Sequence, residues 1–469
     1  MFSFTNPTTL WFGTFKNRPD APDPSAVYPP KLYTSYDSNM GLFVTTAWII
    51  VMEGFRHLLE PNLVALMKES MYNATVGDGY RVGGVDGDNL YPIYSNPWYM
   101  RVMSATYVGH MMGDANMTFW DNEWARQGIA EFDRFGTLSE HFLSPFTEQF
   151  NSATYTGVTL FALSLWGYMP ANSTIAGRAA DIVATTWESV GNLWNPTLKT
   201  LGGPWDRSYG FSMKSYFGIL GVQIAGIVGG LDDDSAPLPS PLVGSEHYGD
   251  AAIIALVPLV SKFHDRYVSP TVRSKLVRLK GRGHAHFAQA VSPPFDNIAY
   301  PRNYTSWTQA GLSVGGIEVD SNVVGGPAIN PSQFSPGVIL WDAGHSSTGW
   351  ISHFSTSRSI SATASSKSLT ISYPPSRAFP SLDTGSSNIM TFLISGFKHV
   401  SLGVEFMANS TSMLPGLRLT LSGNVVAQST RMFEYGNGAL NNLLYYNLTY
   451  LIPDGLEGVP EIVLAFEKI

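Results

Sequence analysis

A carboxylate, a guanidinium and a phenol lie close together in the segment WDRSYG, residues 205–210. Arg207 could bind an anion while Tyr209 acts as an acid or a base. Asp206 and Tyr209 in a low-dielectric pocket could equally form an acid–base pair on an uncharged substrate. A structural interpretation stays open, because charged side chains beside a buried helix need partners. Asp206 would then cap the following helix, and Arg207 would tie down a loop.

A second polar segment, EQFNSATY at residues 148–155, leads into an apolar helical pattern. Asn151 or Ser152 can cap that helix by accepting hydrogen bonds from the N–H groups of its first turn. Tyr155 then lies in the first turn, on the face that carries Val158. The segment therefore has two interpretations, membership of a site or plain capping and packing.

Three histidines are further candidates for chemistry. His141 lies near Asn151 in the sequence, and His284 and His286 alternate at the start of a predicted strand, so that both imidazoles share one face. The pair could bind a metal or a substrate. No third ligand follows at a diagnostic spacing, so we predict no metal and assign His284 and His286 to substrate binding. A basic strip precedes the two histidines, either as a solvated strand face or as a wall for an anionic substrate: Arg273, Lys275, Arg278, Lys280 and Arg282.

Several familiar motifs are absent or incomplete. Residues 311–315 (GLSVG) fit G-x-S-x-G, but that elbow requires a strand, a sharp turn and a helix, and the following residues indicate a strand. Residues 86–89 lack the later Gly and Glu of a calcium loop. The sequence contains no P-loop, dinucleotide fingerprint or H-E-x-x-H motif. We therefore predict that the protein uses no cofactor.

The composition narrows the classes of partner. Charged residues make up 14% of the chain and the net charge is −8, which argues against binding nucleic acid. Aromatic residues make up 13%, and Tyr and Trp suit sugar rings as well as large cores. Tyr94 and Trp205 are accordingly predicted to bind a small-molecule or oligosaccharide substrate. The absence of cysteine excludes disulfides, thiolate metal sites and a cysteine nucleophile.

Apolar residues recur at helical spacing in the first half of the sequence. This period predicts helices over residues 42–59, 60–71, 96–112, 117–135, 153–168, 173–194, 211–228 and 248–263. Residues 74–95 are rich in Gly and Asp, which predicts a long loop.

The second half changes to short alternating or β-branched segments between turns. These segments predict strands at residues 275–280, 312–319, 338–341, 357–364, 368–372, 389–394, 401–406, 417–421, 443–451 and 461–466. Helices followed by strands indicate an α+β multidomain fold. We expect an extended arm at residues 1–34, a helical α/α toroid-like domain at 35–267 and an antiparallel β-sandwich domain at 268–469.

Residues 150–155 and 205–210, in helix pairs ahead of a large sandwich, resemble the heparinase and alginate-lyase type of polysaccharide lyase. The resemblance implies an incomplete α/α toroid, antiparallel sheets and cofactor-free β-elimination on an acidic polysaccharide or oligosaccharide. It further implies that Asn151, helped by Arg207, binds the uronate carboxylate. Tyr155 or Tyr209 would then serve as base and acid, with a histidine assisting.

Other functions remain compatible with the sequence. The low charge favours a cofactor-independent isomerase, cyclase, dehydratase or pericyclase acting on a small hydrophobic metabolite. A glycoside hydrolase would need two carboxylates across a cleft, for which Glu148, Asp206 and Asp250 are candidates. A non-catalytic carbohydrate-binding protein is a further alternative.

Targeting signals are sparse. No signal peptide or membrane-spanning segment is visible, since the apolar run at residues 42–52 is far shorter than the roughly 20 residues that a span needs. Six N-x-S/T sequons indicate a secreted or lumenal protein: Asn73, Asn116, Asn172, Asn303, Asn409 and Asn447. The sequence does not reveal the oligomeric state.

Overall fold

The protein is described here by a computed structural model. It describes residues 4–16, 20–31, 36–37, 39–80, 95–135, 151–205, 218–229, 252–290, 300–320, 334–345, 347–377, 387–395, 411–428, 431–437 and 444–469. The chain forms two compact units. The first comprises residues 1–143, 155–186 and 249–267, and the second comprises residues 144–154, 187–248 and 268–469.

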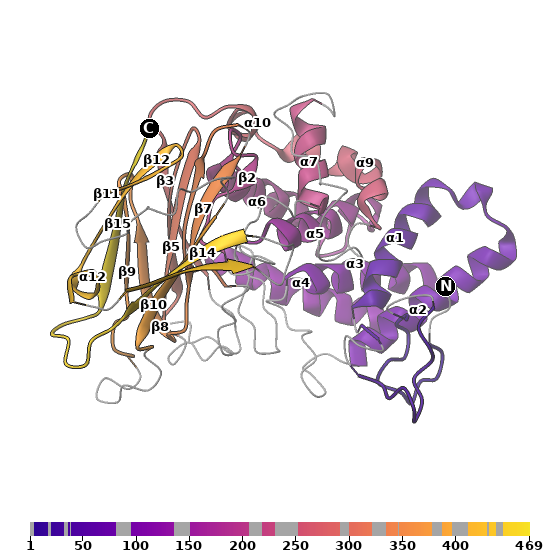
Figure 1. Cartoon of the computed structure of the whole chain (residues 1–469). Coiled ribbons are helices and arrows are strands. Elements are labelled where there is room, and N and C mark those ends of the chain that lie inside the picture. Colours follow the sequence, from indigo (N-terminus) through magenta and orange to yellow (C-terminus); the bar gives the residue numbers. More distant parts are fainter. Residues whose placement is uncertain are drawn as a thin grey trace. The chain divides into compact units, whose positions relative to one another are not determined.

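Helices form the first unit, which confirms the predicted helical character of the N-terminal half (Figure 1). The long ones are α1 (Met40–Gly54), α2 (Pro61–Tyr80), α3 (Ser95–Met112) and α4 (Ala115–Phe135). Helices α5 (Ala153–Ser164) and α6 (Ala179–Leu193) each cross a boundary between the units, and α9 (Val257–Val260) lies between short 3₁₀ turns.

Helix α2 corrects the prediction of a loop that begins at residue 74. The helix continues to Tyr80 in spite of two glycines. Thr75 Oγ1 donates to the Met71 carbonyl, and Asp78 forms a buried ion pair with Arg101 of α3. Tertiary contacts of this kind override weak helix propensity, because they remove apolar and polar groups from water together.

The strands of the second unit form one antiparallel sheet of 13 strands. Its strands are β3 (His284–Ala290), β4 (Arg302–Gln309), β5 (Leu312–Asp320), β6 (Gly337–Asp342), β7 (Thr348–Phe354), β8 (Ser359–Ala364), β9 (Ser368–Ser372), β10 (Ile389–Ser395), β11 (Thr411–Leu414), β12 (Leu417–Ser422), β13 (Arg431–Asn437), β14 (Leu444–Leu451) and β15 (Glu461–Lys468). The short pair β1 (Trp194–Asn195) and β2 (Thr200–Leu201) forms a separate sheet, and α12 (Asn424–Gln428) follows β12.

The large sheet divides into two layers at β5. One edge of β5 pairs with β4, whereas the other edge pairs first with β6, at residues 312–316, and then with β8, at residues 318–320. A Cβ atom on Gly337 of β6 would meet the side chains of Leu369 and Ile371 on β9. Tyr373, directly after β9, donates its hydroxyl hydrogen to His353 of β7 at 2.8 Å. The two layers thus face each other, as expected for a sandwich-like antiparallel fold.

Helix α10 (Pro270–Val277) corrects another prediction, because residues 275–280 were expected to form a strand. Ser269 caps this helix by accepting a hydrogen bond from the Val272 N–H at 3.2 Å, and Pro270 occupies its first turn. A serine cap followed by proline is a helix-start signal, which the alternating basic residues obscured. Strand β3 then begins at His284, as predicted.

Candidate functional site

Asn151 joins two distant parts of the sequence inside the second unit. Its side-chain amide donates to the Gly202 carbonyl at 2.7 Å and to the Pro204 carbonyl at 2.8 Å, and the residue is 2% exposed. A side-chain amide has two N–H donors, so both are occupied by the backbone. Asn151 therefore anchors residues 202–205, which end at Trp205. We call these four residues the clasped segment.

Trp205 ends the clasped segment in a fully buried position. Its backbone exchanges two hydrogen bonds with Ser335, at 3.0 and 2.8 Å. Within the described residues, neither the indole N–H of Trp205 nor the hydroxyl of Ser335 has a hydrogen-bond partner. Buried polar groups nearly always have partners in folded proteins, so these two neighbouring groups are candidates for contact with a ligand.

The clasped segment lies on one face of strands β5 and β6. A Cβ atom on Gly315 would collide with the Gly203 carbonyl, and one on Gly203 would collide with Val338. Only glycine at both positions allows this close approach of two backbones. Ser313 of the GLSVG sequence lies within strand β5, which confirms the prediction that this sequence forms a strand. Its hydroxyl accepts a hydrogen bond from the side chain of Asn195.

The same sheet face carries His284 and His286. In the strand register, His286 is opposite Ser306 and Ser306 is opposite Gly315, so these positions share a face with the clasped segment. His284 donates its Nε2–H to the Asn192 carbonyl at 2.9 Å. Burial, and then the neighbouring His284 and Lys275, lower the pKa of His286, which keeps its imidazole neutral near pH 7.

Arg302 is a candidate that the sequence analysis did not identify. It is 1% exposed at the start of β4, and strand alternation places it on the face of Ser306. Burial lowers the pKa of its guanidinium to about 10, so the group stays charged at neutral pH. The sequence pattern that could have identified Arg302 is its position at the start of the alternating segment RNYTSWTQ, residues 302–309. We call His284, His286, Arg302 and the clasped segment the donor face.

The remaining predicted site residues stay predictions. Tyr155 belongs to the first unit, where it is buried in α5 with 4% of its surface exposed. Seven others fall outside the described residues: Tyr94, His141, Glu148, Asp206, Arg207, Tyr209 and Asp250.

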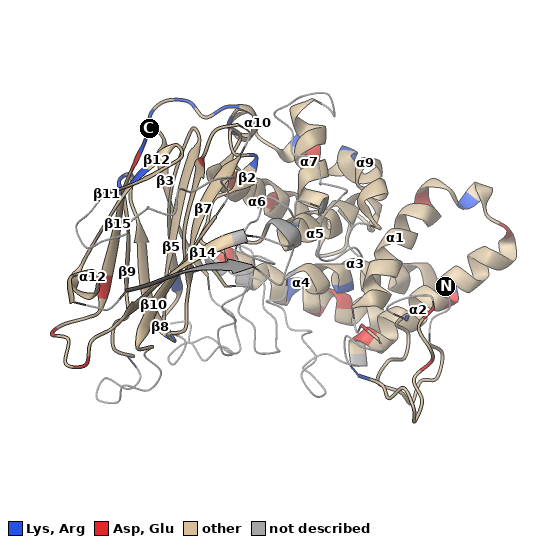
Figure 2. Ribbon diagram, viewed as in Figure 1, with Lys and Arg blue, Asp and Glu red and all other residues tan. Residues whose placement is uncertain are grey.

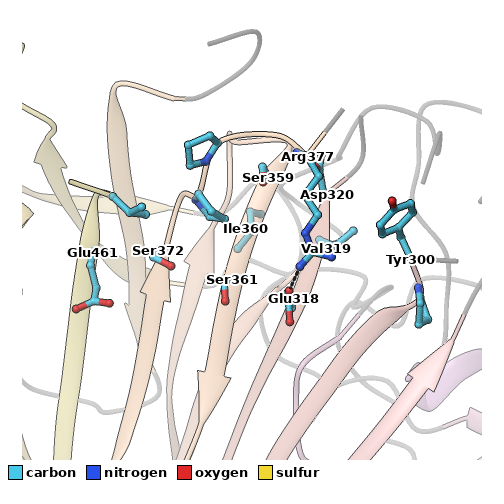
Figure 3. A pocket seen from close by; sticks show the side chains of 14 residues that line it. Tyr300, Glu318, Val319, Asp320, Ser359, Ile360, Ser361, Ser372, Arg377 and Glu461 are labelled. Carbon is cyan, nitrogen blue, oxygen red and sulfur yellow. Dashed lines mark hydrogen bonds and ion pairs between the residues drawn. The ribbon is translucent and has the colours of Figure 1, made fainter. Parts of the chain in front are cut away.

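The second unit also contains a cavity of about 380 Å³ that the sequence analysis missed (Figure 3). It lies where β5 and β9 end and where β8 and β15 begin. Its polar lining includes Glu318, Asp320, Arg377 and Glu461. Charged residues are sparse along most of the described ribbon (Figure 2), whereas three carboxylates line this cavity.

Among the described residues, no group of three His, Asp or Glu side chains is arranged to hold a metal ion. None of the helices in the described part of the chain combines the length and apolar character of a membrane span.

Comparison with known families gives two matches. A family model described as a domain of unknown function (DUF8769) matches residues 2–262. A second, also described as a domain of unknown function (DUF8770), matches residues 282–467. No match was found among curated proteins.

Proposed function

We propose that the chain, which belongs to the DUF8769 family because that model covers more than half of its length, is a lyase. It would cleave an acidic polysaccharide or oligosaccharide by proton abstraction and β-elimination. The observation that carries the proposal is the hydrogen-bonded clasp between Asn151 and the carbonyls of Gly202 and Pro204. The clasp joins Asn151, in the first of the two segments that resemble polysaccharide lyases, to the residues directly before the second segment, which supports the proposal.

The reaction requires a base and donors for negative charge. A base removes the proton next to the uronate carboxylate, the resulting electron pair forms a carbon–carbon double bond, and the glycosidic oxygen leaves with a proton. Negative charge develops on the carboxylate during this step, so preorganised donors accelerate it. The buried indole N–H of Trp205 and the guanidinium of Arg302 are donors of this kind.

The structure refines the role proposed for Asn151. Since backbone carbonyls occupy both of its N–H groups, Asn151 would act as a positioning residue for the clasped segment. Arg207 and Tyr209 follow that segment in the sequence and remain the proposed anion-binding and proton-transfer residues. His286, whose lowered pKa keeps it neutral, is a second candidate for accepting a proton.

The test is the ultraviolet absorbance of unsaturated uronates, measured on a panel of uronate polymers. Trp205→Phe keeps an aromatic ring and removes the indole N–H, which has no hydrogen-bond partner among the described residues. We expect it to lower kcat/KM about tenfold or more, the value of a hydrogen bond to a charged group. No absorbance change on any uronate polymer would contradict the proposed function.

The matched control is Trp194→Phe. Trp194 is equally buried, but its indole N–H donates to the Leu276 carbonyl at 2.9 Å. The control removes the same atoms together with a satisfied hydrogen bond, so it should lower the free energy of unfolding by about 1 kcal/mol more than Trp205→Phe does. It should leave the elimination rate unchanged, which separates a substrate contact from a packing effect.

A further inference from the structure

Four side chains form a polar row across the floor of the cavity at the end of β5, β8, β9 and β15. The strand register places Glu318 opposite Ser361, Ser361 opposite Ser372, and Ser372 opposite Glu461. Residues directly opposite each other share a sheet face, and Figure 3 shows the four in succession. With strands about 4.8 Å apart, the row spans roughly 14 Å.

The hydroxyls of this cavity are free to bind a ligand. Ser359 lines the cavity and is 7% exposed, yet its side chain forms no hydrogen bond within the described residues. The hydroxyls of Ser361 and Ser372 and the carboxylate of Glu461 line the cavity as well, and they form no hydrogen bond with another side chain in the described part of the chain. Hydroxyls that line a cavity without a side-chain partner can exchange bound water for the hydrogen bonds of a ligand.

The other carboxylates are already held in position. Glu318 accepts hydrogen bonds from Asn303 at 3.1 Å and from Arg377 at 2.5 Å. Asp320 accepts a hydrogen bond from the Arg377 backbone N–H at 2.6 Å and from the Ser376 hydroxyl at 3.1 Å. Fixed acceptors of this kind favour a ligand that offers hydroxyl donors, because little side-chain entropy is lost on binding.

The rim of the cavity supplies apolar surface. Tyr300 is 41% exposed beside Pro301, and Pro374 and Pro375 lie on the lining as well. Aromatic and proline rings can contact the C–H face of a sugar while the row below contacts its hydroxyls. The volume of about 380 Å³ lies within the range of small-ligand sites.

The charge of the lining selects among sugars. Three carboxylates face one arginine, which is already paired with Glu318, so the cavity is rich in acceptors and negative in charge. A uronate would meet like charges there, whereas a neutral sugar would supply hydroxyl donors. We propose that this cavity is a second binding site, for neutral oligosaccharides, separate from the elimination reaction.

The experiment is calorimetric titration of the full-length chain with hexasaccharides of β-linked glucose, mannose and xylose, and with hexagalacturonate as the charged comparison. We expect at least one neutral hexasaccharide to bind and hexagalacturonate to bind this site at least about tenfold more weakly. Glu461→Gln and Tyr300→Ala should each weaken neutral binding about tenfold, the value of one good contact.

The matched control is Glu467→Gln, on the same strand β15. Glu467 is exposed and pairs with Arg418 outside the cavity, so its replacement should leave binding unchanged. Absence of binding by every neutral hexasaccharide would overturn the proposal, as would binding that Glu461→Gln and Tyr300→Ala do not alter. Binding of Ca²⁺ without any sugar would also overturn it. Since no turnover is measured, failure here is distinct from failure of the lyase proposal.

Discussion

The two faces of strands β4 and β5 differ in the hydrogen-bonding groups that they present. One is the donor face, with Arg302, His286 and the buried indole of Trp205. The opposite face carries Asn303 and Glu318, and Glu318 leads into the acceptor-rich cavity. Successive side chains of a strand point to opposite faces of the sheet. Neighbouring residues such as Arg302 and Asn303 therefore belong to two different faces, one rich in donors and one rich in acceptors.

The donor face and the cavity also differ in how deeply their polar side chains are buried. The donor face is closed, and burial lowers the pKa of both Arg302 and His286. Donors that are shielded from water interact more strongly with a developing negative charge, which favours catalysis. The cavity carboxylates are half-exposed, and as acceptors they suit the hydroxyl donors of a neutral sugar. The proposed catalytic site and the proposed sugar-binding site would thus lie on opposite faces of one sheet.

The largest expected effect is the loss of stability on acidification caused by His353, which lies where the two layers meet. His353 donates from Nδ1 to the Thr391 carbonyl at 3.0 Å and accepts from the Tyr373 hydroxyl at 2.8 Å, and burial lowers its pKa to about 4. The folded protein therefore binds this proton more weakly than the unfolded chain. The stabilising contribution is present above about pH 6.5 and is lost as the pH falls towards 4, amounting to about 3 kcal/mol.

Denaturant unfolding monitored between pH 7 and pH 4 checks this prediction. His353→Gln keeps one donor and one acceptor but does not titrate, so its unfolding free energy should fall less with acid than that of the parent protein. If sugar binding by the cavity fades over the same interval only in the parent protein, the neighbouring Tyr373 couples the layer contact to the cavity wall. Equal acid sensitivity in both proteins would contradict the prediction.

The second effect concerns the donor face. Arg302→Met replaces a buried guanidinium by an apolar side chain of comparable length. Removing one member of a buried charged contact also lowers stability, so the unfolding free energy of the variant is measured alongside its activity. We expect it to lower uronate elimination about 100-fold, equivalent to about 3 kcal/mol of lost charge stabilisation. Binding of neutral hexasaccharides should be unchanged, since the cavity lies on the other face. Arg418→Met, on an exposed pair, serves as the control.

The sequence predicted the strands whose patterns are local. Strand β9 has the predicted bounds, Ser368–Ser372, because alternation and flanking turns define it. Strand β4 was missed, since RNYTSWTQ buries polar residues such as Arg302 and Ser306 rather than an apolar series. Burial of this kind depends on the layer packed against the strand, which local periodicity does not report.

The candidate sites likewise divide into features that the local sequence predicted and features that depend on tertiary packing. The segments near residues 151 and 207 were expected to lie together, and Asn151 does contact Gly202 and Pro204, but the residues at 206–210 stay a prediction. The cavity could not be predicted, because Glu318 and Glu461 come from strands far apart in the sequence. Only the pairing register makes them neighbours across two serines.

The smallest effect tests whether the acceptors of the cavity are positioned or merely present. Asn303→Ala removes the amide that donates to Glu318 at 3.1 Å and leaves every cavity-lining side chain in place. Arg377 still holds Glu318, so affinity for the neutral hexasaccharide should fall only about two- to threefold, as expected for one half-exposed hydrogen bond. Calorimetry at one salt concentration measures this change. A tenfold loss would mean that Asn303 itself touches the sugar, which would extend the binding surface along β4 and weaken the separation of the two faces.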